Sequence, residues 1–157
     1  MAGKDWFAKA KVQEPNAASD FEVQLGVGDS TPADFDQGDT VYPNGQGVPF
    51  TLTYDGAGNA TFTANGVSTT YPVGINDITN IGITVSAPSD ATTAVSGLVL
   101  STGSLTTTNV SASNSTQYLN IAGASLNGGF TLTGTLQFDW NTLTSNGENQ
   151  KMQISLN

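Results

Sequence analysis

The sequence predicts an all-β protein, an antiparallel β-sandwich or jelly-roll-like fold of about eleven or twelve short strands. The clearest sign is the stretch 129–140, where apolar and polar residues alternate one by one. Alternation over this length is typical of a β-strand with one buried face. Similar short segments recur between turns rich in Gly, Pro, Asn and Asp, and no segment has the period of an amphipathic helix.

The stretch 129–140 is expected to organise the sheet around it. Its apolar row consists of Phe130, Leu132, Leu136, Phe138 and Trp140, with Gly134 in the same row. Thr, Gln and Asp fill the other row. We therefore expect one face of this strand in the core and the other in solvent.

The first strand is expected at the N-terminus, over residues 6–13. Its alternating apolar row consists of Trp6, Ala8, Ala10 and Val12. Three of the four lysines lie in the first eleven residues, so this strand is basic in an acidic chain. A terminal strand can cover an edge of its own sheet or pair with a neighbouring molecule. Both alternatives stay open, and the apolar row is the candidate assembly surface.

A turn or short linker over 14–20 leads to a second strand at 21–27, and the longest polar loop follows over 28–47. This loop carries four aspartates, Asp29, Asp34, Asp36 and Asp39. Calcium prefers several oxygen ligands from such loops. The four aspartates are therefore a candidate Ca²⁺ site, although their spacing is not that of an EF-hand. The alternative is a solvated loop in which Asp caps turns.

Residues 48–73 predict a meander of three strands. Its two turns are the stretch 55–59, which is rich in Gly and Asn, and the dipeptide Asn65-Gly66, a strong hairpin signal. Thr-x-Thr patterns recur here and in 129–140. They indicate the polar faces of ordinary amphipathic strands, because no fixed repeat accompanies them.

The second half of the chain predicts further strands over 78–85, 94–102, 105–110 and 118–122. Pro88, Ser89 and Asp90 separate the first two, and a polar loop is expected over 111–116. Both faces of 94–102 are apolar, which favours a central position. After the stretch 129–140, a polar loop over 141–150 leads to a last strand at 152–156.

Composition narrows the possible functions. Net charge is −9, and the chain has no Arg, His or Cys. Nucleic-acid binding is disfavoured because phosphate contacts need cationic side chains. The absence of His and Cys removes the Ser-His-Asp triad, thiol nucleophiles and most zinc sites. A glycosidase would need two facing carboxylates. Nothing in the sequence indicates a second acid that would face Asp139 or Glu148. We therefore expect no enzymatic activity.

Exposed aromatic rings could alternatively stack on sugars. Tyr42 lies in the long polar loop and is the candidate ligand-binding residue, whereas Trp140 belongs to an apolar row and is expected in the core. A carbohydrate-binding module with an adhesive role is thus an alternative function, and a phage structural protein is a third.

Length and hydropathy favour a single domain over 1–157. No apolar run approaches the roughly 18 residues of a membrane helix, so membrane insertion is not expected. Met1 is not followed by a hydrophobic signal core. The Thr-, Asn- and Gly-rich composition nevertheless favours an extracellular or cell-surface protein.

Several strand patterns resemble those of the bacterial "choice-of-anchor" surface domains. They are the stretches 47–55, 60–63, 118–121 and 129–134, and the resemblance spans roughly residues 21 to 156. It implies a secreted β-sandwich in a surface layer, matrix or appendage, without catalytic residues. Together these patterns predict a structural protein that assembles into a homo-oligomer or filament through strand exchange and divalent cations. Polysaccharide is a further expected partner.

Overall fold

The computed structural model describes residues 5–13, 22–28, 35–74, 77–122, 126–141 and 148–157, and these residues form ten strands and no helix. All strand pairs are antiparallel. The predicted all-β antiparallel class is therefore confirmed. Within the described ranges, no helix could cross a membrane.

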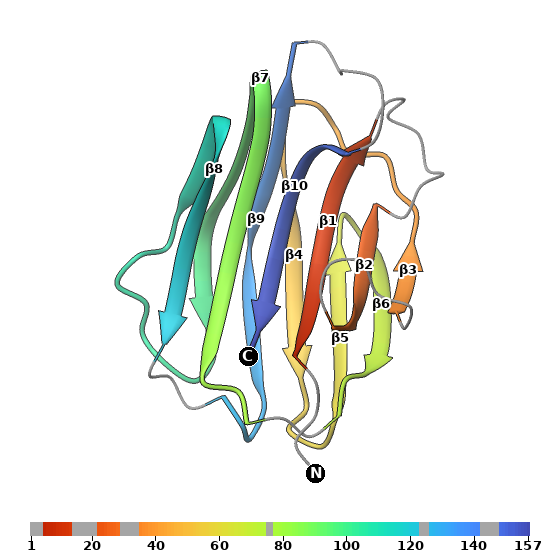
Figure 1. Cartoon of the computed structure of the whole chain (residues 1–157), viewed down its shortest axis with the longest axis vertical. Helices are drawn as coiled ribbons and strands as arrows, with labels where there is room; N and C mark the ends of the chain where they lie inside the picture. The colour runs from red at the N-terminus through yellow and green to blue at the C-terminus, as the bar shows by residue number, and fades with distance from the viewer. Residues whose placement is uncertain (1–4, 14–21, 29–34, 75–76, 123–125, 142–147) are drawn as a thin grey trace.

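The strands follow the chain order shown in Figure 1. They are β1 (Trp6–Gln13), β2 (Val23–Val27), β3 (Phe35–Gly38), β4 (Gln46–Tyr54), β5 (Asn59–Ala64), β6 (Val67–Pro72), β7 (Asn80–Leu100), β8 (Val110–Ala122), β9 (Phe130–Trp140) and β10 (Glu148–Leu156).

Strand β7 joins two layers of the sheet. The strand order is β3-β2-β1-β10-β7-β9-β4-β5-β6, and β8 pairs with β7 outside this path. The first part of β7 pairs with β10 over Ile81–Ser86, and the last part pairs with β9 from Ala91 onward. The change of partner coincides with a register shift at 88–91, where Asp90 has a φ of 61°. A β-bulge of this kind bends a strand so that one strand can serve two layers.

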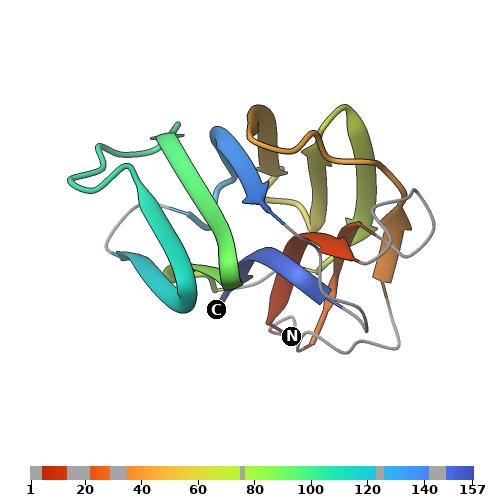
Figure 2. The ribbon, with the colours of Figure 1, turned by 90° about the horizontal axis from the view of Figure 1, so that it is seen from above.

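The two ends of the sheet meet, which makes the molecule a nearly closed barrel. Strands β2 and β3 contact β6 across the seam. There the Thr70 N–H donates to the Asp36 carboxylate at 2.8 Å. Seen from above in Figure 2, β7 and β8 lie at one side of the molecule and the β3–β6 seam lies at the other.

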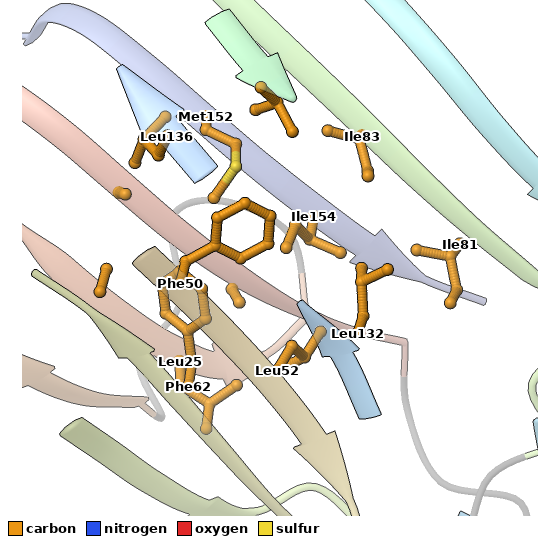
Figure 3. Close-up of a cluster of buried hydrophobic side chains, with 14 of the residues drawn as sticks. Leu25, Phe50, Leu52, Phe62, Ile81, Ile83, Leu132, Leu136, Met152 and Ile154 are labelled. Carbon is orange, nitrogen blue, oxygen red and sulfur yellow. The ribbon is translucent and has the colours of Figure 1, made fainter. Parts of the chain in front are cut away.

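The core lies between the two layers, as the close-up in Figure 3 shows. Phe50 from β4 and Met152 and Ile154 from β10 meet there, with Leu132 and Leu136 from β9 close by. The row predicted for 129–140 is buried from Phe130 to Phe138 apart from Gly134, while Trp140 is half-buried. This outcome confirms that the alternating stretch supplies one face to the core.

Three boundaries differ from those that the sequence predicts. The strands expected over 78–85 and 94–102 are one strand, β7, because the Pro88–Asp90 segment makes a bulge rather than a turn. The segment 111–116 is part of β8 instead of a loop, and most of 105–110 lies outside any strand. The long polar loop contains the short strand β3. These differences reduce the expected strand count to ten among the described residues.

Candidate functional site

The predicted calcium loop is described only in part. Asp29 and Asp34 lie outside the described residues, so their relation to Asp36 and Asp39 stays a prediction. Asp36 belongs to β3, where its Oδ2 accepts the Thr70 N–H, and Asp39 is exposed just after this strand. Within the described residues, no three Asp or Glu side chains gather into a group that could hold a metal. Asp36 therefore has a defined structural role at the barrel seam.

Tyr42 is buried, so the expectation of an exposed ring in the polar loop was wrong. Its side chain is 1% exposed, and its ring meets Phe138 edge-on with centroids 4.9 Å apart. Its hydroxyl donates to the Glu22 carbonyl at 3.1 Å. Burial raises the pKa of Tyr42 far above its ordinary value, and the Glu22 carboxylate adds to this shift. In this position Tyr42 anchors the loop to the core and has no face for a sugar.

The candidate assembly row lies in a central strand. Strand β1 pairs within its own chain, with β2 on one side and with β10 on the other, so it lies inside the sheet and the expected position at a sheet edge was wrong. Its four apolar side chains are at most 1% exposed; they are Trp6, Ala8, Ala10 and Val12. Trp6 packs against Tyr54 of the opposite layer at a centroid distance of 5.7 Å, and against Phe130 at 6.4 Å.

The other row of β1 is buried as well. Phe7, Lys9 and Lys11 are 1%, 4% and 8% exposed. Lys11 lies directly opposite Lys151 of β10. Strand β1 is therefore enclosed on both faces and both edges. We refer below to the position between β2 and β10 as the β1 slot.

The Thr-x-Thr patterns come into register across the second layer. One row of cross-strand partners runs Ser68, Thr63, Thr51, Thr133, and a parallel row runs Thr70, Thr61, Thr53, Thr131. The hydroxyls of Thr63 and Ser68 are 2.7 Å apart, so part of their hydrogen bonding is satisfied within the row. These contacts agree with the expected polar face of an amphipathic sheet.

Two carboxylates line one shallow hollow, although nothing in the sequence indicates that they lie close together. Asp90 and Asp139 border a depression of about 270 Å³ together with Asn114 and Asn141. Pairing of β7 with β9 brings them together, because Ala91 lies opposite Trp140. The sequence could not place these acids together, since the register of two strands this far apart in sequence depends on the bulge in β7. Asn114, with a φ of 47°, marks the same irregular point on β8.

The chain matches no protein-family model and no curated protein. The resemblance to choice-of-anchor domains therefore stays a prediction.

Proposed function

We propose that this chain is a non-enzymatic structural protein of an extracellular or cell-surface assembly, and that its copies join by exchanging strand β1. One observation supports the proposal above the others. Strand β1, which is enclosed on every side, is the first of the described strands, and one connection joins it to the others, through β2. A strand that one connection joins to the rest of its sheet can leave its slot and enter the slot of another copy.

The contacts of the β1 slot suit such an exchange. All the hydrogen bonds and packing that β1 makes with β2 and β10 are the same whether β1 comes from the same chain or from another copy. The free-energy difference between the two states therefore depends mainly on the connection to β2 and on concentration. That connection, residues 14–21, could span up to about 28 Å if fully extended.

The residue inventory supports a structural rather than a catalytic role. Without His, Cys and Arg, the chain lacks the side chains most often used as general bases, nucleophiles and phosphate clamps. The alternative of carbohydrate binding loses Tyr42, which is buried, and would have to use another ring such as the exposed Tyr118. The Thr-, Asn- and Gly-rich composition supports the extracellular location. The aspartates between 29 and 39 are the residues through which calcium would stiffen the assembly.

The experiment is to unfold and refold the full chain at high concentration and to measure its mass by light scattering and its shape by electron microscopy. We expect polymers or closed oligomers. A peptide of residues 5–13 in excess should shorten them, because it fills the β1 slot of terminal subunits. The refolding is repeated with calcium at about 1 mM, the range of extracellular calcium modules, and with a chelator.

The matched control is the same peptide with Ala8→Lys and Ala10→Lys. These positions are 0% exposed in the slot, so the charged peptide should not enter it and should leave the polymers unchanged. A refolded chain that is monomeric under every condition contradicts the proposal. So do polymers that both peptides leave untouched.

A further inference from the structure

Strand β8 has one long edge that pairs with no described strand, and residues 104–107 lie beside its end at 119–122, where the two segments line one hollow. It pairs with β7 along one side, and no described strand pairs with its other side. From Ser115 to Ala122 its register with β7 is continuous, so the free edge is regular over this length. Proteins usually blunt such edges with Lys, Pro, bulges or short length. Beyond the irregular point at Asn114, this segment has none of these features.

The other ends of the described sheet are covered. Strands β3 and β6, at the two ends of the strand order, approach each other at the barrel seam. The Asp36–Thr70 hydrogen bond crosses this seam, and the Asn65 side chain donates to the Val41 carbonyl and the Thr40 hydroxyl on the far side. Among the described strands, β8 is therefore the one with a long edge that pairs with no other strand.

Charge is unevenly distributed between the two sides of the molecule. Between residues 78 and 138 the chain has a single charged residue, Asp90, although its net charge is −9. Strands β7 and β8 lie within this neutral stretch, at the side opposite the seam (Figure 2). Two copies with the same negative charge repel least where their neutral sides meet, because repulsion between distant exposed charges is screened within about a Debye length.

We propose that β8 is a self-association edge, and that two copies pair antiparallel along residues 115–121. A second copy fits this edge because it supplies an equally neutral strand of the same length. The proposal does not depend on exchange of β1, since folded chains can form this contact without opening. In an assembly built by β1 exchange, the same contact would join neighbouring filaments side by side.

Symmetry fixes which residues meet in such a pair. A two-fold axis perpendicular to the sheet brings residues of the same face opposite each other. Tyr118 lies near the middle of the regular segment and is 75% exposed. Centring the axis there places Tyr118 opposite Tyr118 of the second copy, and Thr116 opposite Asn120. Aromatic cross-strand pairs of this kind stabilise strand pairing.

The test measures the dimer dissociation constant of the full, folded chain by sedimentation over a concentration series. Tyr118→Lys should raise this constant at least about tenfold, because two like charges would face each other across the pair. Val99→Lys is the matched control. Val99 is an exposed apolar residue of the neighbouring strand β7, at 61% exposure, and its substitution should leave the constant unchanged.

A cross-link gives a second reading of the same contact. The chain has no cysteine, so Tyr118→Cys introduces a single thiol. Mild oxidation should link two chains at this position and should not link Val99→Cys chains.

The proposal is overturned if the wild-type chain stays monomeric up to about 1 mM. It is also overturned if both lysine variants weaken association equally, or if the two cysteine variants cross-link alike. Dimers of β8 dissociate on dilution without unfolding, whereas exchange of β1 requires it, so the two proposals fail separately.

Discussion

Phe50 and Gly134 are direct cross-strand partners, and the ring of Phe50 occupies the space that a side chain at 134 would fill. An ideal Cβ on Gly134 would lie 2.8 Å from Phe50 Cε1 and 3.1 Å from Leu98 Cδ2. The glycine that interrupts the apolar row of β9 is thus covered by an aromatic ring from β4. Pairing an aromatic with a glycine across strands is a known way to pin the register of a sheet.

Gly134→Ala should therefore destabilise the protein by about 1–3 kcal/mol through overpacking. Urea unfolding measures this change. Gly82→Ala in β7 is the control, because a Cβ there would meet only the Ser155 carbonyl oxygen at 3.9 Å, an ordinary contact. Phe50→Leu added to Gly134→Ala should recover part of the loss. If the two alanine variants are equally stable, the covering of Gly134 does not constrain the core.

Asn44 acts as a short extra strand residue beside Trp140. Its Nδ2 donates to the Trp140 carbonyl at 2.7 Å, and its Oδ1 accepts the Trp140 N–H at 3.0 Å. Asn44→Ala should lower the free energy of unfolding by about 1–2 kcal/mol, since two exposed hydrogen bonds are lost. Asn120→Ala on β8, measured at low protein concentration, should cost much less, because Asn120 is exposed and the backbone pairing of β8 with Gly82 does not need its side chain. Equal losses would argue against this role for Asn44.

Asp55 makes stability depend on acid pH. The backbone N–H of Asn59, then its side-chain amide and the Ala57 N–H, lower the pKa of Asp55 below its ordinary value of 3.8. Because the pKa of Asp55 is lower in the folded state than in the unfolded chain, the ionised carboxylate stabilises the fold at pH values above the unfolded-state pKa. This stabilisation is lost as the pH falls through the folded-state pKa. The stability difference between wild type and Asp55→Asn should thus be constant near neutral pH and shrink below about pH 4. A difference that persists unchanged in acid would contradict this explanation.

Tyr42 makes stability depend on alkaline pH in the opposite sense. Burial, with a smaller effect of Glu22, raises the pKa of Tyr42 in the folded state. The protonated Tyr42 therefore contributes its full stabilisation of the fold at pH values below the tyrosine pKa of the unfolded chain, which is near 10. Above that pH the free energy of unfolding falls by up to about 1.4 kcal/mol per pH unit. Tyr42→Phe should remove this part of the decline and cost about 1 kcal/mol at neutral pH for the lost Glu22 hydrogen bond. Stability measured between pH 8 and about 11 checks this. A Tyr42→Phe variant that declines as steeply as the wild type would contradict this explanation.

Alternation predicted the strands that carry an apolar row on at least one face. Strands β1, β4, β5, β9 and β10 were found because each carries an apolar row, which in β9 is interrupted at Gly134. Strand β8 was only partly found, since the Ser- and Asn-rich residues 111–116 have no such row. They become extended through pairing with β7, a contact that no local pattern encodes.

The candidate sites were harder to predict because they depend on long-range register. Tyr42 sits in a polar stretch, yet Phe138 and Glu22 from distant parts of the chain bury it. Asp90 and Asp139 share a hollow only because the bulge in β7 aligns it with β9. Local polarity therefore predicted exposure correctly for Asp39 and wrongly for Tyr42.

Exchange of β1 between copies is tested most directly with one cysteine in β1 and one in the neighbouring strand β10. Lys11 of β1 and Lys151 of β10 are direct cross-strand partners, and the chain is otherwise free of cysteine. Chains carrying Lys11→Cys and chains carrying Lys151→Cys are unfolded together, refolded and mildly oxidised. Exchange predicts disulfides that join one variant to the other, because β1 of one chain then lies beside β10 of another. If the mixture yields no such link, while a chain carrying both substitutions closes its own disulfide, β1 stays in its own molecule and the proposed assembly is wrong.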